Sequence, residues 1–427
     1  MKLNYWRTTI IGLAFMSICA FWQLYEGIVP LILKDTFKIG DTLAGVIMAL
    51  DNILALFMLP LFGAISDRTS TPIGKRMPFI IGGTALAVVA MVLMPVGDNM
   101  GSFTLFILAL LVTLVAMSTY RSPAVALMPD VTPKPLRSKA NAVINLMGAV
   151  GGAITLVLIS VLIPKTGKAD YFPIFAIIAG LMVAAVVILA LAVKENKLVA
   201  EMKATDGHQT GTEEANSGVK EKMEPDVKKS LIFILLSIFF WFMAYNAVTT
   251  AFSKYARDFL GIQGGGFATN LLIATGAAVL SYIPVGIIAS KVGRKKTILV
   301  GIMMLFASFV AAFFFTTYTP LLSVLLVFIG SGWAAINVNS YPMVVEMSKG
   351  SNVGKYTGYY YTFSMAAQIL TPVASGALLQ YVSYRTLFPY AALFMALAFV
   401  TMTMVQHGDS KPQTPKDKLE MMDAGDA

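Results

Sequence analysis

Long apolar runs separated by short polar segments dominate the chain. Each run holds about the 20 apolar residues that a helix needs to cross roughly 30 Å of hydrocarbon. Most of the runs lack the polar face of a soluble helix. The pattern therefore predicts an all-α membrane protein with twelve spans, at residues 8–33, 43–65, 77–97, 103–129, 139–163, 171–193, 230–253, 267–289, 297–316, 320–346, 354–380 and 386–405.

Two longer polar segments divide this pattern. Residues 194–229 are rich in Glu, Lys, Gly and Thr and lack the apolar residues of a core, so we expect a flexible cytoplasmic linker there. Residues 406–427 have a similar character and are expected to form a cytoplasmic tail. The predicted domains are a six-helix bundle at residues 1–193 and a second at residues 230–405.

Composition supports a membrane protein and excludes other classes. The chain is 57% hydrophobic and 13% charged, whereas about a quarter of the residues in soluble domains are charged. Most of the 32 Lys and Arg residues lie in loops that would share a side with both termini, which places that side in the cytoplasm. The net charge of +9 therefore needs no nucleic-acid partner. With one cysteine and both histidines in polar segments, we expect no metal and no cofactor.

Matching short patterns occur in the two halves. The separation between matched positions changes only at loops, which indicates a duplicated six-helix unit, a common way to build a transporter. We expect the halves to be related by a pseudo-two-fold axis along the membrane normal. The matched positions are Gly63 with Gly286, Asp67 with Ser290, Arg68 with Lys291, Gly74 with Gly293, Lys75 with Arg294, Arg76 with Lys295 and Asp130 with Glu346.

The loop after the second expected span, GAISDR followed by GKR, resembles the signature loop of the major facilitator superfamily. The later segment GIIASKVGRKK is similar to its second copy, with Ser290 where an acid is usual. The stretches SDRTSTPIGKRMPF and YRSPAVALMPD resemble the sucrose/proton symporter-like and glycoside–pentoside–hexuronide:cation symporter families. These resemblances imply the major facilitator fold and symport of a sugar or glycoside, such as a sucrose-type or maltose-type disaccharide, by alternating access. The eleventh expected span, from Thr357 to Gln380, lacks the lysine of melibiose-type members, which argues against their sodium coupling.

The clearest ionisable residues in the interior of the expected spans are Glu26, Asp51 and Arg121. Such a group at a span centre costs at least about 2.5 kcal/mol, and it therefore indicates function. Their repeat counterparts are uncharged, so the fold does not require them; these are Thr249, Ala274 and Asn337.

These three residues are the expected proton-coupling group. Burial favours the protonated form of a carboxyl group and a nearby arginine favours the ionised form. A carboxylate that alternately pairs with Arg121 and releases it can load and discharge a proton, and we expect Asp51, beside Asn52, to be that partner. The alternatives are a permanent ion pair that fixes helix packing and, for Glu26, ordinary solvation near the end of a long span.

The resemblance also implies a cytoplasmic gate at the signature loop and its copy. Positive-inside topology explains the basic side chains there but not the repeated glycines and their spacing. The expected acids at the inner ends of the fourth and tenth spans would act as latches between helices. The expected gate residues are Gly63, Asp67, Arg68, Gly74, Lys75, Arg76, Asp130, Gly286, Lys291, Gly293, Arg294, Lys295 and Glu346.

A sugar site needs aromatic faces for the ring and amides or acids for the hydroxyl groups. The superfamily resemblance implies that spans 1, 4, 7 and 10 line the cavity, and span 11 adds further candidates. The alternative is an aromatic belt or helix packing, which is strongest for the tyrosines at 359–361 because they cannot all face one way. The expected substrate-binding residues are Trp22, Gln23, Tyr245, Asn246, Trp333, Asn337, Asn339, Tyr361 and Gln368.

The leading hypothesis is a proton-coupled sugar symporter that acts as a monomer in the cell membrane, with both termini in the cytoplasm. Its partners would be a small-molecule substrate and the lipid bilayer. A drug/proton antiporter and a sodium-coupled sugar symporter are the alternatives on the same fold. We expect no enzyme, because the sequence has no HExxH motif and no intramembrane histidine. A sensor without transport is a further alternative, although no soluble signalling domain is evident.

Overall fold

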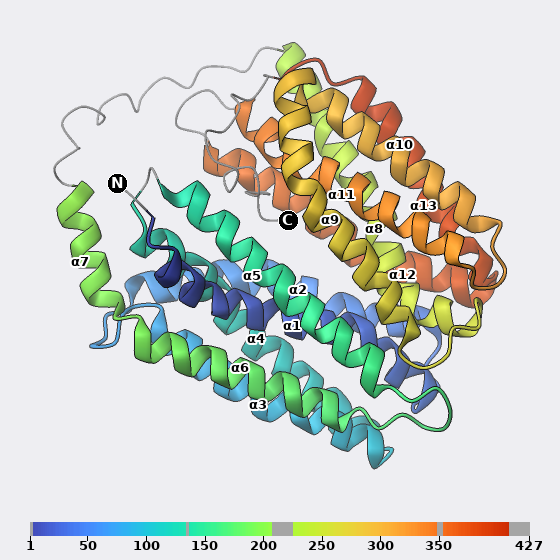
Figure 1. Cartoon of the computed structure of the whole chain (residues 1–427), viewed down its shortest axis with the longest axis horizontal. Coiled ribbons are helices and arrows are strands. Elements are labelled where there is room, and N and C mark those ends of the chain that lie inside the picture. The colour runs from blue at the N-terminus through green and yellow to red at the C-terminus, as the bar shows by residue number, and fades with distance from the viewer. Residues whose placement is uncertain (1–2, 134–135, 207–224, 348–352, 410–427) are drawn as a thin grey trace. The chain divides into compact units, whose positions relative to one another are not determined.

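The computed structural model describes residues 3–133, 136–206, 225–347 and 353–409. Within these residues, 12 helices are long and apolar enough to cross a membrane, which confirms the predicted all-α fold. They are α1 (Tyr5–Asp35), α2 (Asp41–Arg68), α3 (Met77–Asn99), α4 (Phe103–Val131), α5 (Arg137–Leu162), α6 (Phe172–Ala192), α8 (Pro225–Asp258), α9 (Gly266–Val292), α10 (Arg294–Phe313), α11 (Pro320–Glu346), α12 (Val353–Tyr381) and α13 (Leu387–Thr403), shown in Figure 1. Two shorter helices are α7 (Glu195–Asp206) and η3 (Tyr384–Thr386).

The chain divides into two compact units. Unit 1 comprises Met1–Lys38 and Leu50–Glu213, and unit 2 comprises Ile39–Ala49 and Glu214–Ala427. The first turns of α2 therefore group with unit 2, although the sequence boundaries placed the whole helix in the N-terminal bundle. Close packing on α12 explains this, because a Cβ at Gly45 would collide with the carbonyl oxygen of Pro372.

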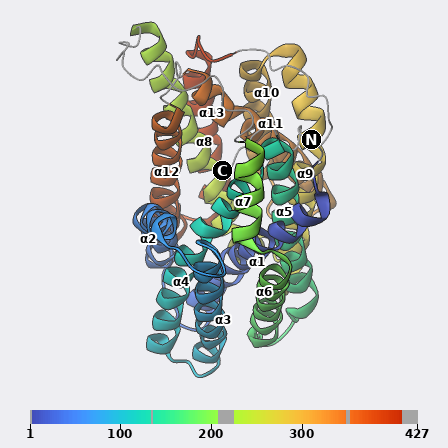
Figure 2. The same ribbon diagram turned by 90° about the vertical axis from the view of Figure 1, so that its left-hand side faces the viewer.

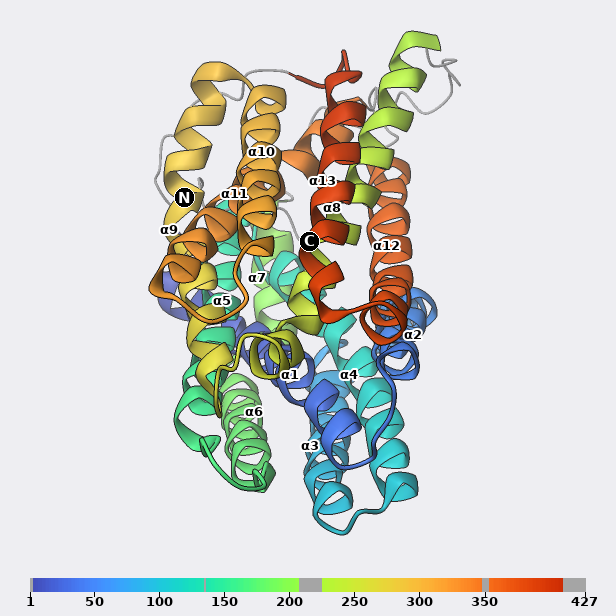
Figure 3. The ribbon, with the colours of Figure 1, turned by 90° about the vertical axis from the view of Figure 1, so that its right-hand side faces the viewer.

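Equivalent helices make equivalent contacts in the two units. In unit 1, α1 packs against α5 and α6, and α3 packs against α4 and α6; Figure 2 shows α3 beside α4. In unit 2, α8 packs against α12 and α13, and α10 packs against α11 and α13; Figure 3 shows α8, α12 and α13 as neighbours. Each unit thus uses these four pairs in the same chain order, as a duplicated six-helix unit requires, whereas the close contact of α9 with α11 in unit 2 has no counterpart of similar extent between α2 and α4 in unit 1.

The segment expected to be a flexible linker contains regular structure at its ends. Residues 194–229 include α7 and the first residues of α8. Helix α7 leaves the end of α6 and starts beside the loop between α2 and α3 (Figure 1). Four residues of the expected tail, 406–409, are also described. The rest of both segments lies outside the described residues.

Glycines allow close approach between helices inside each unit. A Cβ at Gly151 of α5 would collide with the carbonyl oxygen of Met16 in α1, and one at Gly330 of α11 with that of Ala274 in α9. Small residues at such crossings permit backbone contact between membrane helices. Gly151 therefore permits the close packing of α5 against α1.

We predict that Gly151→Ala destabilises unit 1 by roughly 1–3 kcal/mol, because the added methyl group forces α1 and α5 apart. The matched control is Gly180→Ala in α6, where a Cβ meets no atom within 4 Å. Alanine is the better helix former by about 1 kcal/mol, so this control should melt at the wild-type temperature or above. Thermal unfolding in detergent, followed by circular dichroism, compares the two. Equal melting temperatures would contradict the packing described.

Candidate functional site

The three charged residues expected in the spans all lie in unit 1. Glu26 on α1, Asp51 on α2 and Arg121 on α4 are each half-buried, and Asp51 interacts electrostatically with both of the others. The side-chain amide of Asn52 donates a hydrogen bond of 2.8 Å from Nδ2 to Asp51 Oδ1, as the sequence suggested. The fold thus assembles one charged group from three helices.

Arg121 faces an aromatic ring in this structure. Its Cζ lies 5.8 Å from the centroid of the Trp22 ring, within the range of a cation–π interaction. Among the described residues, Arg121 makes no direct ion pair with a carboxylate. The expected pair with Asp51 is therefore not formed here, and the stack on Trp22 takes its place.

Trp22 stands in an aromatic cluster on α1. Its ring packs edge-on against Phe21 at 5.1 Å and against Tyr25 at 5.5 Å between centroids. Its buried Nε1 has no hydrogen-bond partner among the described residues. Buried donors in native proteins almost always have an acceptor, so an N–H without one among the described residues is unusual. The neighbouring Gln23, also expected in the site, is half-buried and faces α5 at Gly152.

In unit 2, Tyr245 on α8 and Trp333 on α11 form a stacked pair. Their centroids are 3.7 Å apart with an interplanar angle of 4°. Phe242 packs edge-on against Trp333 at 5.4 Å, which leaves Trp333 only 9% exposed. Tyr245 is half-buried and keeps more free surface than Trp333. Of the two rings, Tyr245 is therefore better placed to meet a ligand.

The expected amides of unit 2 differ in their availability. Asn246 and Asn339 each donate one hydrogen bond of 2.9 Å to a carbonyl four residues earlier, Phe242 O and Ala335 O. Asn339 is buried, whereas Asn246, Asn337 and Gln368 are half-buried. The half-buried amides are thus the better candidates for contact with a solute.

The tyrosines at 359–361 point in different directions, as their spacing required. Tyr360 is fully buried, with its hydroxyl 3.3 Å from Ser340 Oγ. Tyr361 packs against Tyr341, with 6.4 Å between ring centroids. The ring of Tyr359 lies beneath the ammonium of Lys355. Tyr361 keeps its predicted place among the candidates, while Tyr360 serves helix packing.

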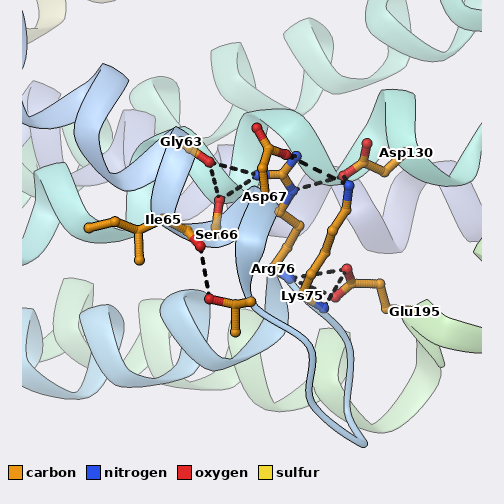
Figure 4. Close-up of polar contacts among 9 residues, drawn as sticks. Gly63, Ile65, Ser66, Asp67, Lys75, Arg76, Asp130 and Glu195 are labelled. Carbon is orange, nitrogen blue, oxygen red and sulfur yellow. Dashed lines mark hydrogen bonds and ion pairs between the residues drawn. The ribbon is translucent and has the colours of Figure 1, made fainter.

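Of the expected gate residues of unit 1, Asp67, Lys75 and Asp130 form one ion cluster around Arg76, which Figure 4 shows. Its Nε donates to Asp130 Oδ2 at 2.8 Å, and its other nitrogens donate to Ser66 and Asp67. The ammonium of Lys75 lies 3.1 Å from the same carboxylate of Asp130. Arg76 is 4% exposed. A buried guanidinium with two carboxylate partners binds the ends of α2 and α4 to the start of α3.

The second copy, in unit 2, uses different partners. Arg294 forms an ion pair with Glu346, whereas Lys295 donates through Nζ to the carbonyl oxygens of Thr403 at 2.9 Å and Val405 at 2.6 Å. Ser290 replaces the first acid and bonds its own helix at Ile287 O. The missing acid thus explains why the lysine turns to carbonyl groups. The expected gate residues Arg68 and Lys291 are exposed, and Gly63 and Gly286 are half-buried.

Sequence reasoning missed a buried ion pair in unit 2, at the opposite end of α2 from Asp67. Lys254 Nζ lies 2.6 Å from Asp41 Oδ1, and the Tyr384 hydroxyl donates to Asp41 Oδ2 at 2.8 Å. Both charged residues are buried. The only sequence signal was an acid just before an apolar run, which is common at helix starts. This contact fastens the first turn of α2 to α8 and η3.

Comparisons with known proteins agree with this architecture. The sequence profile of the family described as MFS/sugar transport protein matches residues 10–418. The MFS-type transporter ppzB of Metarhizium rileyi (strain RCEF 4871) is 28% identical over 139 residues, which are 32% of this chain and 29% of that protein. The crystal structure of a mutant of the nucleoside transporter NupG matches 94% of this chain and 100% of its own, with a TM-score of 0.69 and 14% identity. At that identity the likeness shows the fold alone.

We predict that Arg76→Ala lowers the stability of unit 1 by roughly 2–4 kcal/mol, because it leaves the partly buried Asp130 with fewer partners and unties three helix ends. Arg68→Ala removes an exposed arginine eight positions earlier and should change stability by less than about 0.5 kcal/mol. Thermal unfolding of the two variants in one detergent provides the comparison. A loss in Arg68→Ala as large as that in Arg76→Ala would contradict the cluster described.

Proposed function

The chain belongs to the family of MFS/sugar transport proteins, and we propose that it carries a sugar or glycoside across the cell membrane together with protons. The observation that supports this best is the contact between Arg121 and Trp22, in a group that also holds Glu26 and Asp51. Arg121 thus belongs to the proposed proton-binding group and also contacts Trp22, the proposed sugar-binding ring.

This shared side chain offers a route for coupling. A sugar beside Trp22 would accept hydrogen bonds from the guanidinium through its hydroxyl groups. Protonation of a carboxyl group of this charged group would weaken its attraction for Arg121 and leave the guanidinium at the ring, where it can donate to the sugar. Substrate binding and proton binding would then carry a coupling free energy, which symport requires.

We assign the Arg76 cluster to the cytoplasmic gate. The loops expected on the same side of the membrane as this cluster carry most of the Lys and Arg residues, and the positive-inside rule places such loops in the cytoplasm. Arg76 binds the ends of α2 and α4, so any separation of those ends breaks its bonds. Alternating access needs such contacts to form in one state and break in another. Both termini would lie on the same side of the membrane as this gate.

The test of the function is uptake of a panel of radiolabelled disaccharides into proteoliposomes, with and without an inward proton gradient. Proton symport predicts that the gradient concentrates a sugar above its external level. Accumulation that follows a sodium gradient alone would assign the other coupling ion. Uptake driven by an outward proton gradient would indicate an antiporter and overturn the proposal. Uptake confined to lipophilic cations would do the same.

We predict that Asp51→Asn abolishes uphill sugar uptake but retains substrate binding and counterflow exchange. Asparagine resembles the protonated acid in shape, and exchange needs no net proton movement. The matched control is Asp258→Asn, which changes an exposed acid outside the charged group and should leave accumulation near the wild-type level.

Proteoliposome uptake and counterflow, measured on the same preparations, distinguish the two steps. If Asp51→Asn still concentrates sugar as the wild type does, Asp51 is not the coupling acid. Glu26→Gln would then be the variant to examine.

A further inference from the structure

Both units place an acid from the segment after their sixth helix at the start of their third helix. In unit 1 this acid is Glu195, which follows α6, and in unit 2 it is Asp409, which follows α13. Both residues fall in segments that the sequence presented as linker and tail. The signature glycine of each loop lies directly beside the acid. The repeat therefore extends beyond the membrane-spanning helices.

The Glu195 carboxylate accepts hydrogen bonds from the backbone around Arg76. Its Oε1 accepts the main-chain N–H groups of Lys75 at 2.9 Å and Arg76 at 3.0 Å, and its Oε2 accepts that of Met77 at 3.1 Å. The side chain is 1% exposed. Such N–H groups at a helix start have no partner within the helix, and a carboxylate satisfies them while opposing the positive end of the helix dipole.

The next residue of α7 holds the same loop. Asn196 donates through Nδ2 to the carbonyl oxygens of Thr71 at 2.9 Å and Pro72 at 3.0 Å. The first two residues of α7 thus clamp both ends of the short loop between α2 and α3. The linker helix and the gate loop form one connected structure.

In unit 2, Asp409 Oδ1 accepts the main-chain N–H of Lys295 at 2.9 Å. Ser230 Oγ on α8 lies 2.9 Å from His407 Nδ1 and accepts the N–H of Gln406 at 3.1 Å. The segment after α13 is therefore fastened to both α8 and α10. Asp409 is exposed, so its hold is weaker than that of Glu195.

The repeated glycines have a physical reason in this arrangement. Gly74 has φ of 122° and Gly293 has φ of 99°, values that side chains other than glycine rarely adopt. A Cβ at Gly74 would overlap the Glu195 carboxylate, and one at Gly293 would lie 3.0 Å from Asp409 Oδ1. The glycine both turns the chain and leaves room for the acid.

We propose that Glu195 and Asp409 are positioning residues of the two gates. Each fixes the backbone at the start of the third helix of its unit, and so aims the basic side chains at their partners. In unit 1 the connection runs from the linker through Glu195 to Arg76, and from Arg76 to the ends of α2 and α4. Movement of α7 would thereby be transmitted to the gate. This inference rests on the proposed gate function of the Arg76 cluster.

Hydrogen exchange tests the positioning without any substrate. In purified full-length protein, Glu195→Ala should speed exchange of the amides of residues 75–77 by about tenfold, because these donors lose their acceptor. It should also speed exchange in the last turn of α2, residues 64–68, because the Arg76 side chain is no longer held in position to bond Asp67. Glu195→Gln keeps an acceptor oxygen and should restore most of the protection. Asp409→Ala should produce a smaller change, confined to the start of α10.

The transport assay adds a double-mutant cycle. Glu195→Ala should lower the maximal uptake rate by about fivefold and leave KM within about twofold. In an Asp67→Asn background, where the gate cluster is already weakened, Glu195→Ala should lower the rate by less than about twofold more. A purely structural role would lower protein yield and multiply the two losses.

The outcomes separate the two proposals. Unchanged exchange rates at residues 75–77 in Glu195→Ala would overturn the positioning role. Faster exchange at residues 75–77 without faster exchange at residues 64–68 would overturn it as well. So would fully multiplicative losses in the cycle. A wild-type protein that takes up no sugar would instead refute the proposed substrate, while the exchange experiment would still decide whether Glu195 positions the loop.

Discussion

The cost of placing a charge in hydrocarbon governs this structure. An isolated charged side chain is unfavourable in the interior of a membrane, so charges occur where partners can be supplied. Arg76 meets two carboxylates, and Lys254 meets Asp41. Both contacts lie at ends of α2, and removing one partner of the buried pair of Lys254 and Asp41 costs several kcal/mol. The ends of these helices are therefore joined by ion pairs, and breaking an ion pair requires a new partner for each charge.

Against this background the charged group of unit 1 is exceptional. Glu26, Asp51 and Arg121 lie within the spans without a direct ion pair to Arg121 among the described residues. The arginine is stabilised instead by the face of Trp22, a weaker partner than a carboxylate. An arginine with two competing kinds of partner can exchange one for the other as ligand and proton arrive. A permanent ion pair would hold the helices but could not respond.

The sequence was sufficient for the elements and insufficient for their contacts. The twelve apolar runs, the duplicated loop and the charged group all follow from local patterns, because membrane spanning imposes length and composition on each helix. The exchange of Asp51 for Trp22 as the partner of Arg121 depends on side-chain geometry across three helices, which no local pattern contains. Glu195 was overlooked for a different reason. It lies in a polar segment whose composition indicated a linker. Only the three-dimensional position of the loop before α3 shows that its carboxylate accepts hydrogen bonds from that loop.

Proton symport requires that protons move with the sugar in the same direction. Proton movement in a lightly buffered suspension of wild-type proteoliposomes tests it most directly, with a pH electrode in the external medium and no imposed gradient. Under proton symport, addition of a transported sugar makes the medium more alkaline at a rate proportional to sugar entry. Acidification of the medium, or sugar entry with no change in pH, would contradict it.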